Sequence, residues 1–190
     1  MGSSSNITGL ILAGGAGRRV GLRDKGLIEW RGRPLVSHVC DRLKPQVDEL
    51  LISCNRNLSR YQDYTQQVVV DDRKDFQGPL AGLEAASTRL HTEYLAVVSC
   101  DMPEIPPDLV KRLLKPFVQE RNGSPEISYA HDGSRSQYLC AVLKRDCLQT
   151  LQSFLNEGHR AVRDWYRQHD AVAVDFSDCS ACFQNHNRLD

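Results

Sequence analysis

The amino-acid sequence predicts an α/β fold in which a mostly parallel sheet carries helices on both of its faces. Three observations lead to this prediction. Apolar runs of strand length recur along the chain, they alternate with segments whose apolar residues recur at helical spacing, and short connections join the two kinds of segment. Because parallel strands need a crossover connection, usually a helix, this alternation itself indicates parallel pairing.

Length and composition are those of a soluble globular protein. The 190 residues are enough for one well-buried core, and 41% are apolar while 25% are charged. The formal net charge is zero, which argues against general nucleic-acid binding and against a polybasic membrane contact. No apolar run approaches the ~20 residues of a membrane span. We expect a single domain over residues 1–190, acting as a monomer without nucleic-acid or membrane partners.

The beginning of the chain and its cysteines bear on the compartment. Residues 1–5 lack the basic start and apolar stretch of a signal peptide, so we expect a disordered start and a cytoplasmic protein. The seven cysteines are scattered, an odd number that favours reduced thiols. Only Cys179 and Cys182 form a C-x-x-C pair. Without a second pair or spaced histidines, we interpret that pair as a coincidence rather than a redox or metal site.

The first predicted strand covers residues 7–12, an apolar run broken only by Thr8 and Gly9. After a glycine-rich loop and a turn at 31–33, Pro34 suits the first position of a helix, because its ring fixes φ at a helical value. The apolar face of that helix is formed by Leu35, Val36, Val39, Cys40 and Leu43. Pro45 ends it.

The next elements alternate in the same way. Residues 49–54 form an apolar run that predicts a second strand, residues 61–64 a short helical piece, and residues 68–70 a third strand. Gly78 and Pro79 open a helix whose apolar face is Leu80, Leu83, Ala86 and Leu90. The run 94–100 has the strongest strand character in the chain.

The last third of the chain completes the sheet. A helix that starts at Pro106-Pro107-Asp108 is striped by apolar residues from Leu109 to Val118. Strands are predicted at 127–130 and 138–143 around a turn at Asp132-Gly133-Ser134. The final elements are a helix at 147–155, a short helix at 161–166 and a strand at 171–174.

The loop after the first strand has the composition of a polyphosphate-binding loop. It contains Gly14, Gly15, Gly17 and Arg19, and Lys25 follows shortly after. Glycines allow backbone N–H groups to approach an anion together, and the basic side chains add positive charge. Two well-known phosphate motifs do not match. Val20 stands at the third glycine of G-x-G-x-x-G, and no Gly-Lys pair forms a P-loop.

Polar residues follow several other predicted strands. Ser53 and Asn55 lie at the end of the second strand, Asp71 and Asp72 at the end of the third, and Asp101 at the end of the run 94–100. In parallel sheets ligands bind outside the carboxyl ends of the strands. We therefore expect these residues and the glycine loop to face one crevice.

The chemistry of these residues suits nucleotidyl transfer, in which the protein positions phosphates and neutralises their charge. Mg²⁺ takes one or two carboxylates together with phosphate oxygens and water, and we expect Asp101 to be that carboxylate. Lys25 and Arg19 would hold the β- and γ-phosphates and stabilise the departing pyrophosphate. Gly14, Gly15 and Gly17 would offer backbone N–H groups.

The same residues resemble the molybdenum cofactor guanylyltransferases, the MobA family of nucleotidyltransferases. The resemblance rests on residues 12–15, Arg19, Gly21, Asp24-Lys25-Gly26, Gly32-x-Pro34-Leu35, Asn55-Arg56, Asp71, residues 78–82 and Cys100-Asp101-x-Pro103. It implies a three-layer Rossmann-like nucleotidyltransferase fold. It also implies transfer of GMP from GTP to molybdopterin with release of pyrophosphate, dependence on Mg²⁺, and partner proteins of molybdenum insertion and molybdoenzyme maturation.

The family pattern also implies which residues contact the nucleotide. These are Leu12, Ala13, Gly14, Lys25, an asparagine after the second strand, Asp71 and Asp101, and Asp101 also takes the metal. The asparagine position falls on Ser53, with Asn55 two residues on, so either side chain is a candidate for guanosine recognition. Two family elements depart from the pattern: a His-Pro-Thr-like element reads Gln137-Tyr138-Leu139, and the closing Asn-x-Asn-Thr-Pro reads Asn185 to Leu189.

Two other functions remain open at this point. One is a cytidylyltransferase that acts on the same pterin or on a related phosphorylated acceptor. The other is a non-catalytic nucleotide-binding accessory protein for molybdoenzyme maturation. The presence of both Lys25 and Asp101 argues against the second, because a binding-only protein would not need a metal carboxylate beside a pyrophosphate clamp.

Overall fold

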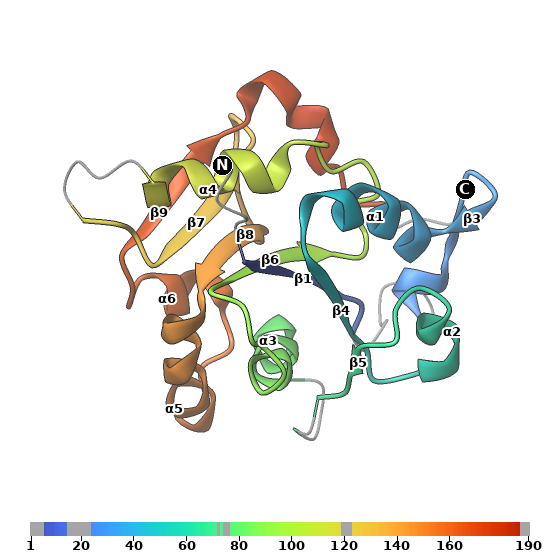
Figure 1. The fold of residues 1–190 in the computed structure, drawn as a ribbon, viewed down its shortest axis with the longest axis horizontal. Coiled ribbons are helices and arrows are strands. Elements are labelled where there is room, and N and C mark those ends of the chain that lie inside the picture. The colour runs from blue at the N-terminus through green and yellow to red at the C-terminus, as the bar shows by residue number, and fades with distance from the viewer. Residues whose placement is uncertain (1–5, 15–23, 72, 74–76, 119–122, 187–190) are drawn as a thin grey trace.

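A computed structural model describes residues 6–14, 24–71, 73, 77–118 and 123–186 of the chain. Its centre is a seven-stranded sheet with the strand order β5-β4-β1-β6-β8-β7-β9 (Figure 1). The strands are β1 Ile7–Leu12, β4 Glu49–Ser53, β5 Val68–Val69, β6 Tyr94–Ser99, β7 Ile127–His131, β8 Ser136–Lys144 and β9 Ala171–Asp175. Most neighbours are parallel, and β8 alone is antiparallel to both of its neighbours, β6 and β7. The mostly parallel α/β sheet predicted from the sequence is confirmed.

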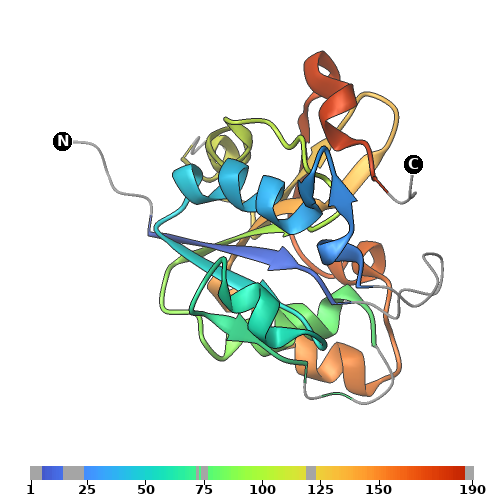
Figure 2. The ribbon, with the colours of Figure 1, turned by 90° about the vertical axis from the view of Figure 1, so that its right-hand side faces the viewer.

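Helices cover both faces of the sheet (Figure 2). The helices α1 Leu35–Leu43 and α4 Leu109–Val118 lie on one face, and α3 Pro79–Ser87, α5 Leu151–Asn156 and α6 Val162–Tyr166 lie on the other (Figure 1). The short α2, Leu58–Gln62, packs near β5. Side chains of a strand point alternately to the two faces, so Ile7 and Ile11 join the core under α1 while Leu10 and Leu12 join the core under α3. The three-layer arrangement follows from this alternation.

A two-stranded hairpin was not predicted. It consists of β2 Glu29–Trp30 and β3 Arg33–Pro34, and it carries the chain from the loop into α1. Arg31 and Gly32 form its turn with positive φ angles of 50° and 77°, as hairpin turns of this length require. Pro34 therefore belongs to the second short strand and caps α1, which begins one residue later than the sequence predicted.

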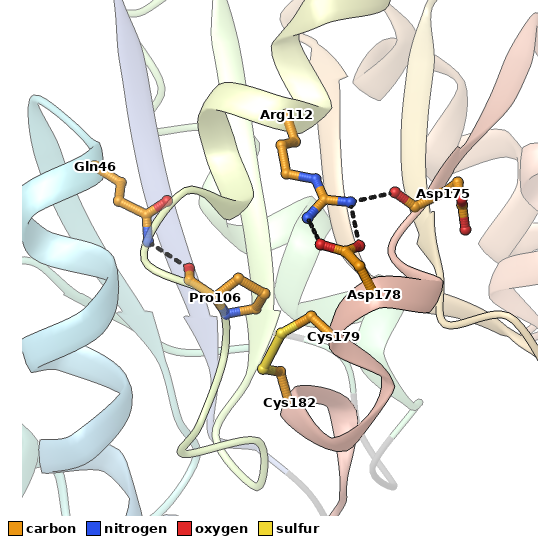
Figure 3. Close-up of a disulfide and its surroundings, with 7 residues drawn as sticks. All are labelled: Gln46, Pro106, Arg112, Asp175, Asp178, Cys179 and Cys182. Atoms are coloured by element: carbon orange, nitrogen blue, oxygen red, sulfur yellow. Dashed lines mark hydrogen bonds and ion pairs between the residues drawn. A yellow bond between two sulfur atoms is a disulfide. The ribbon is translucent and has the colours of Figure 1, made fainter.

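The interpretation of the Cys179 and Cys182 spacing as a coincidence was wrong, because the two sulfurs are bonded to each other. The two residues form a disulfide within the 3₁₀ helix η5, Ser177–Phe183 (Figure 3). The backbone is kinked at Cys179, whose φ of −139° and ψ of 35° are not helical. Across this kink the Cα atoms of the two cysteines are 5.6 Å apart. Arg112 on α4 holds the same helix through a two-pronged ion pair with Asp178, at 2.8 and 3.0 Å. The other five cysteines are free and buried, as expected.

Candidate functional site

Three neighbouring parallel strands end at the same level of the sheet. In the strand register, Leu12 at the end of β1 lies between Ser53 of β4 and Ser99 of β6. Hydrogen bonds continue this alignment past the strands, since Ala13 N–H donates to the Ser53 carbonyl at 2.8 Å and Cys100 N–H to the Leu12 carbonyl at 3.1 Å. The polar residues that follow these strands are therefore brought together at one edge, as the sequence predicted.

Lys25 and Asp101 form an ion pair at this edge. They are 76 positions apart in the chain, and Asp101 is almost completely buried, at 3% exposure. Its second carboxylate oxygen accepts a hydrogen bond from Ser99 Oγ at 2.5 Å. A buried carboxylate is costly unless it is paired and hydrogen-bonded, and here both partners are present. The Lys25 side chain is one-third exposed, so it is accessible to a ligand.

A second set of contacts holds Lys25 in place. Asp24 accepts a hydrogen bond from the Tyr61 hydroxyl at 2.5 Å and another from the Asn57 side chain at 3.0 Å. Tyr61 is fully buried, and burial raises the pKa of its hydroxyl far above the ordinary value, so it acts as a donor at any physiological pH. A Cβ at Gly26 would lie 2.4 Å from the Tyr61 hydroxyl, so a side chain there would displace Tyr61. Tyr61 was not among the predicted site residues, because Asp24, its partner, lies 37 positions away in the chain.

The predicted nucleotide residues on the β4 side form a connected group. The side-chain oxygen of Asn55 accepts a hydrogen bond from Asp71 N–H at 2.9 Å, and the Asn55 amide lies beside Gly14. Ser53 is buried at 2% exposure beneath Gly82 of α3. Of the two alternatives for guanosine recognition, Asn55 is thus the more accessible. Gly15, Gly17 and Arg19, as well as Asp72, lie outside the described residues.

A cavity of about 600 Å³ opens beside the ion pair. Its lining includes Lys25, Ser99, Asp101, Met102, Gln137 and Asn185, and α6 contributes Val162 and Arg163. The segment that carries Asn185 is fixed against the site because His186 N–H donates to the Asp101 carbonyl at 2.9 Å and the His186 ring packs on Trp30. A cavity of this size, lined by a lysine and a buried carboxylate, is typical of a small-molecule site.

Asp101 is the described residue best suited to bind a metal ion. Among the described residues, no three His, Cys, Asp or Glu side chains lie close enough together to form a metal site by themselves. One carboxylate is sufficient for Mg²⁺ where substrate phosphates and water complete the coordination. The buried Asp101 carboxylate, at the wall of a cavity that also contains Lys25, fits that requirement.

Gly82→Ala tests how tightly α3 packs on the site. A Cβ at this position would lie 2.6 Å from Ser53 Oγ and 2.9 Å from Leu12 Cδ2. We expect the variant to lose about 1–3 kcal/mol of unfolding free energy and its Tm to fall by roughly 3–10 °C. Scanning calorimetry measures this loss. The matched double variant Ser53→Ala/Gly82→Ala removes the nearest atom and should recover part of the loss, whereas an unchanged Tm in the single variant would contradict the packing.

Comparisons with known proteins agree on one family. The model of the MobA-like NTP transferase domain matches residues 9–172. Proteins named molybdenum cofactor guanylyltransferase are similar along almost the whole chain. That of Shewanella sediminis is 41% identical over 184 residues, covering 97% of this chain and 92% of the relative, and that of Shewanella baltica is 42% identical with the same coverage.

Solved structures agree with the fold. The molybdopterin-guanine dinucleotide biosynthesis protein A of Archaeoglobus fulgidus superposes with a TM-score of 0.74 at 18% identity, covering 95% of this chain and 92% of that one. The 4-diphosphocytidyl-2C-methyl-D-erythritol synthase of Anaerococcus prevotii superposes with a TM-score of 0.72 at 10% identity, covering 98% of this chain and 94% of that one. At such low identity these two likenesses support a Rossmann-like nucleotidyltransferase fold and nothing finer.

Proposed function

The chain belongs to the family of MobA-like NTP transferases, and from this premise we propose how its crevice performs guanylyl transfer. The enzyme is a molybdenum cofactor guanylyltransferase, which transfers GMP from GTP to molybdopterin and releases pyrophosphate. The observation that supports the catalytic assignment best is the Lys25–Asp101 ion pair at the wall of the large cavity.

In this proposal GTP lies over the ends of β1, β4 and β6. Leu12, Ala13 and Gly14, at the end of β1, contact the nucleotide through their backbone. Asn55 and Asp71 contact the guanosine, and Ser53 lies buried next to them. Lys25 neutralises the β- and γ-phosphates, and its place beside the cavity supports this role. Binding of the same phosphates by Gly15, Gly17 and Arg19 stays a prediction.

The second substrate occupies the cavity. A terminal phosphate oxygen of molybdopterin attacks the α-phosphorus of GTP, a new P–O bond forms, and the bond to the bridging oxygen of pyrophosphate breaks. The protein contributes orientation and charge neutralisation rather than a covalent intermediate. Members of this family are metal-dependent enzymes, and we propose that Asp101 holds Mg²⁺. When bound, that ion stabilises negative charge on the reacting phosphates.

We further propose that the enzyme acts as a monomer in the cytoplasm and passes its product to molybdoenzyme-maturation proteins. Among the described residues, four large apolar side chains are exposed: Leu58, Val70, Val118 and Val172. A few exposed apolar residues are normal on the surface of a monomer. Five of the seven cysteines are free thiols, which fits a reducing compartment, and the disulfide that is present joins residues only three apart in the chain. No helix among the described residues is long and apolar enough to cross a membrane.

Thermal shift with GTP, CTP, ATP and UTP, each with and without Mg²⁺, tests the proposed nucleotide. A ligand at ~100 times its dissociation constant stabilises by ~2.7 kcal/mol, which raises Tm by about 5–10 °C in a chain of this size. We expect that rise with GTP and a larger one with Mg²⁺ present. A selective rise with CTP would move the protein to cytidylyl transfer, and no rise with any nucleotide would contradict the phosphate site.

A further inference from the structure

One side chain in the cavity has its polar end fixed by a buried charge. Gln137 lies on β8, is only 6% exposed, and lines the cavity together with Lys25 and Asp101. Gln137 has no role in the guanylyl transfer proposed for Lys25 and Asp101. Its surroundings determine which of its two amide atoms a substrate can use.

The backbone of β8 is irregular where it reaches the cavity. Tyr129 of β7 lies opposite Ala141, yet the next residue, Ala130, lies opposite Gln137. The residues between, Tyr138 to Cys140, therefore form a bulge. The pairing of β8 with β6 stops at Cys140, so the bulge extends past the end of β6, where Asp101 lies. Bulges next to active sites typically serve to redirect side chains.

A buried carboxylate fixes the Gln137 amide. Asp132 Oδ2 accepts a hydrogen bond from Gln137 Nε2 at 2.6 Å. Its other oxygen accepts bonds from the Ser134 N–H and hydroxyl and from Arg135 N–H, at 2.7–2.8 Å. Burial opposes ionisation of Asp132, but these donated hydrogen bonds outweigh it and hold its pKa well below the usual range. An ionised carboxylate can only accept, so the NH₂ group must face Asp132 and the carbonyl Oε1 must be the atom left for a ligand.

Building on the proposed function, we propose that Gln137 recognises the pterin ring of the acceptor, with Asp132 as its positioning residue. Gln137 Oε1 accepts a hydrogen bond from an N–H group of the ring. A carbonyl oxygen backed by an anion does not attract a phosphate, so Gln137 contacts the ring end of the acceptor rather than its phosphate end. Met102, Leu139 and Val162 line the same cavity and supply the apolar surface that a flat heterocycle needs.

Steady-state kinetics with GTP and molybdopterin tests this assignment. Gln137→Met keeps the length of the side chain and removes the acceptor atom. We expect its KM for molybdopterin to rise about tenfold, while its KM for GTP stays within about twofold of the wild type. Asp132→Asn allows the Gln137 amide to rotate by 180°, since an asparagine can donate a hydrogen bond as well as accept one. This variant should raise the KM for molybdopterin about threefold. Gln168→Met, at an exposed glutamine, is the matched control and should change neither constant.

Inhibition by two simple probes separates the ring from the phosphate. Free pterin should inhibit the wild type competitively against molybdopterin and should inhibit Gln137→Met about tenfold less well, while inhibition by inorganic phosphate should be the same for both. An unchanged KM for molybdopterin, or equal rises in both KM values, would overturn the role of Gln137 and leave the proposed function intact. Absence of turnover in the wild type would overturn both. If Gln137→Met fails to fold, Asp132→Asn tests the proposal instead. A rise in its KM for molybdopterin with no change in its KM for GTP would support the role of Gln137, and an unchanged KM for molybdopterin would overturn it.

Discussion

Asp101→Asn should reduce kcat by about 10³-fold or more and leave the fold intact. The substitution keeps the shape of the side chain and an oxygen that can accept the Ser99 hydrogen bond. It removes the charge that pairs with Lys25 and that we propose holds Mg²⁺. Single groups that stabilise transition-state charge contribute roughly 10²–10³ in rate, and loss of a metal ligand adds to that. Pyrophosphate release in the presence of GTP, Mg²⁺ and molybdopterin measures the effect.

The matched control for this variant is Asp146→Asn. Asp146 is strongly exposed and its only described ion pair is at 4.0 Å, with its neighbour Arg145, so its loss should change neither kcat nor Tm. The circular dichroism spectrum and Tm of Asp101→Asn should stay close to those of the wild type, because Lys25 keeps access to water when its partner is gone. Normal product formation by Asp101→Asn would remove Asp101 from the mechanism and would favour the non-catalytic alternative.

Lys25→Met should weaken GTP binding by about 10–100-fold, since a charge-assisted hydrogen bond to phosphate is worth roughly 1.5–3 kcal/mol. The structure adds an effect that was not foreseen from the sequence. Without Lys25, the buried Asp101 carboxylate loses its ion-pair partner, and an unpaired buried charge is destabilising. We therefore expect both a higher Kd for GTP by calorimetry and a Tm lowered by a few degrees.

Two variants help to interpret that result. Lys111→Met removes an exposed lysine of α4 and should leave Kd and Tm unchanged. Asp101→Asn/Lys25→Met removes both charges, so its Tm should recover relative to Lys25→Met alone, while GTP binding stays weak. Unchanged GTP affinity in Lys25→Met would reassign the phosphate contact to Arg19.

The strands β1 and β6 were predictable from the sequence because each is a largely apolar run of strand length. The strand β1 matches the prediction of 7–12 completely, and β6 ends one residue before the predicted boundary of 94–100. In a strand that is buried on both faces, apolar residues do not alternate with polar ones, so the ends of the strand are easy to recognise in the sequence. The hairpin β2–β3 was missed because each of its strands has two residues, too few to form a pattern.

The candidate site was predictable in part. Lys25 and Asp101 belong to a recognisable motif and a strand end, and the structure brings them into contact. Ser99, Tyr61 and Asp24 hold these two residues, but their hydrogen bonds depend on side-chain positions that no local pattern encodes. The roles proposed for the site residues remain predictions for the experiments above.

By itself, the sequence determined the fold class and the strand ends that carry Asp71 and Asp101, since these follow from apolar periodicity and from residue types at element boundaries. Phosphate binding by the glycine-rich loop stays a prediction. Only the tertiary structure decided the antiparallel insertion of β8, the disulfide within η5 and the contact of Asp132 with Gln137. The position of β8 depends on pairing between residues that are distant in the chain, and such pairing exists only once the layers have packed. The other two contacts are local, but they depend on a kink at Cys179 and on a hairpin turn whose backbone angles no residue pattern specifies.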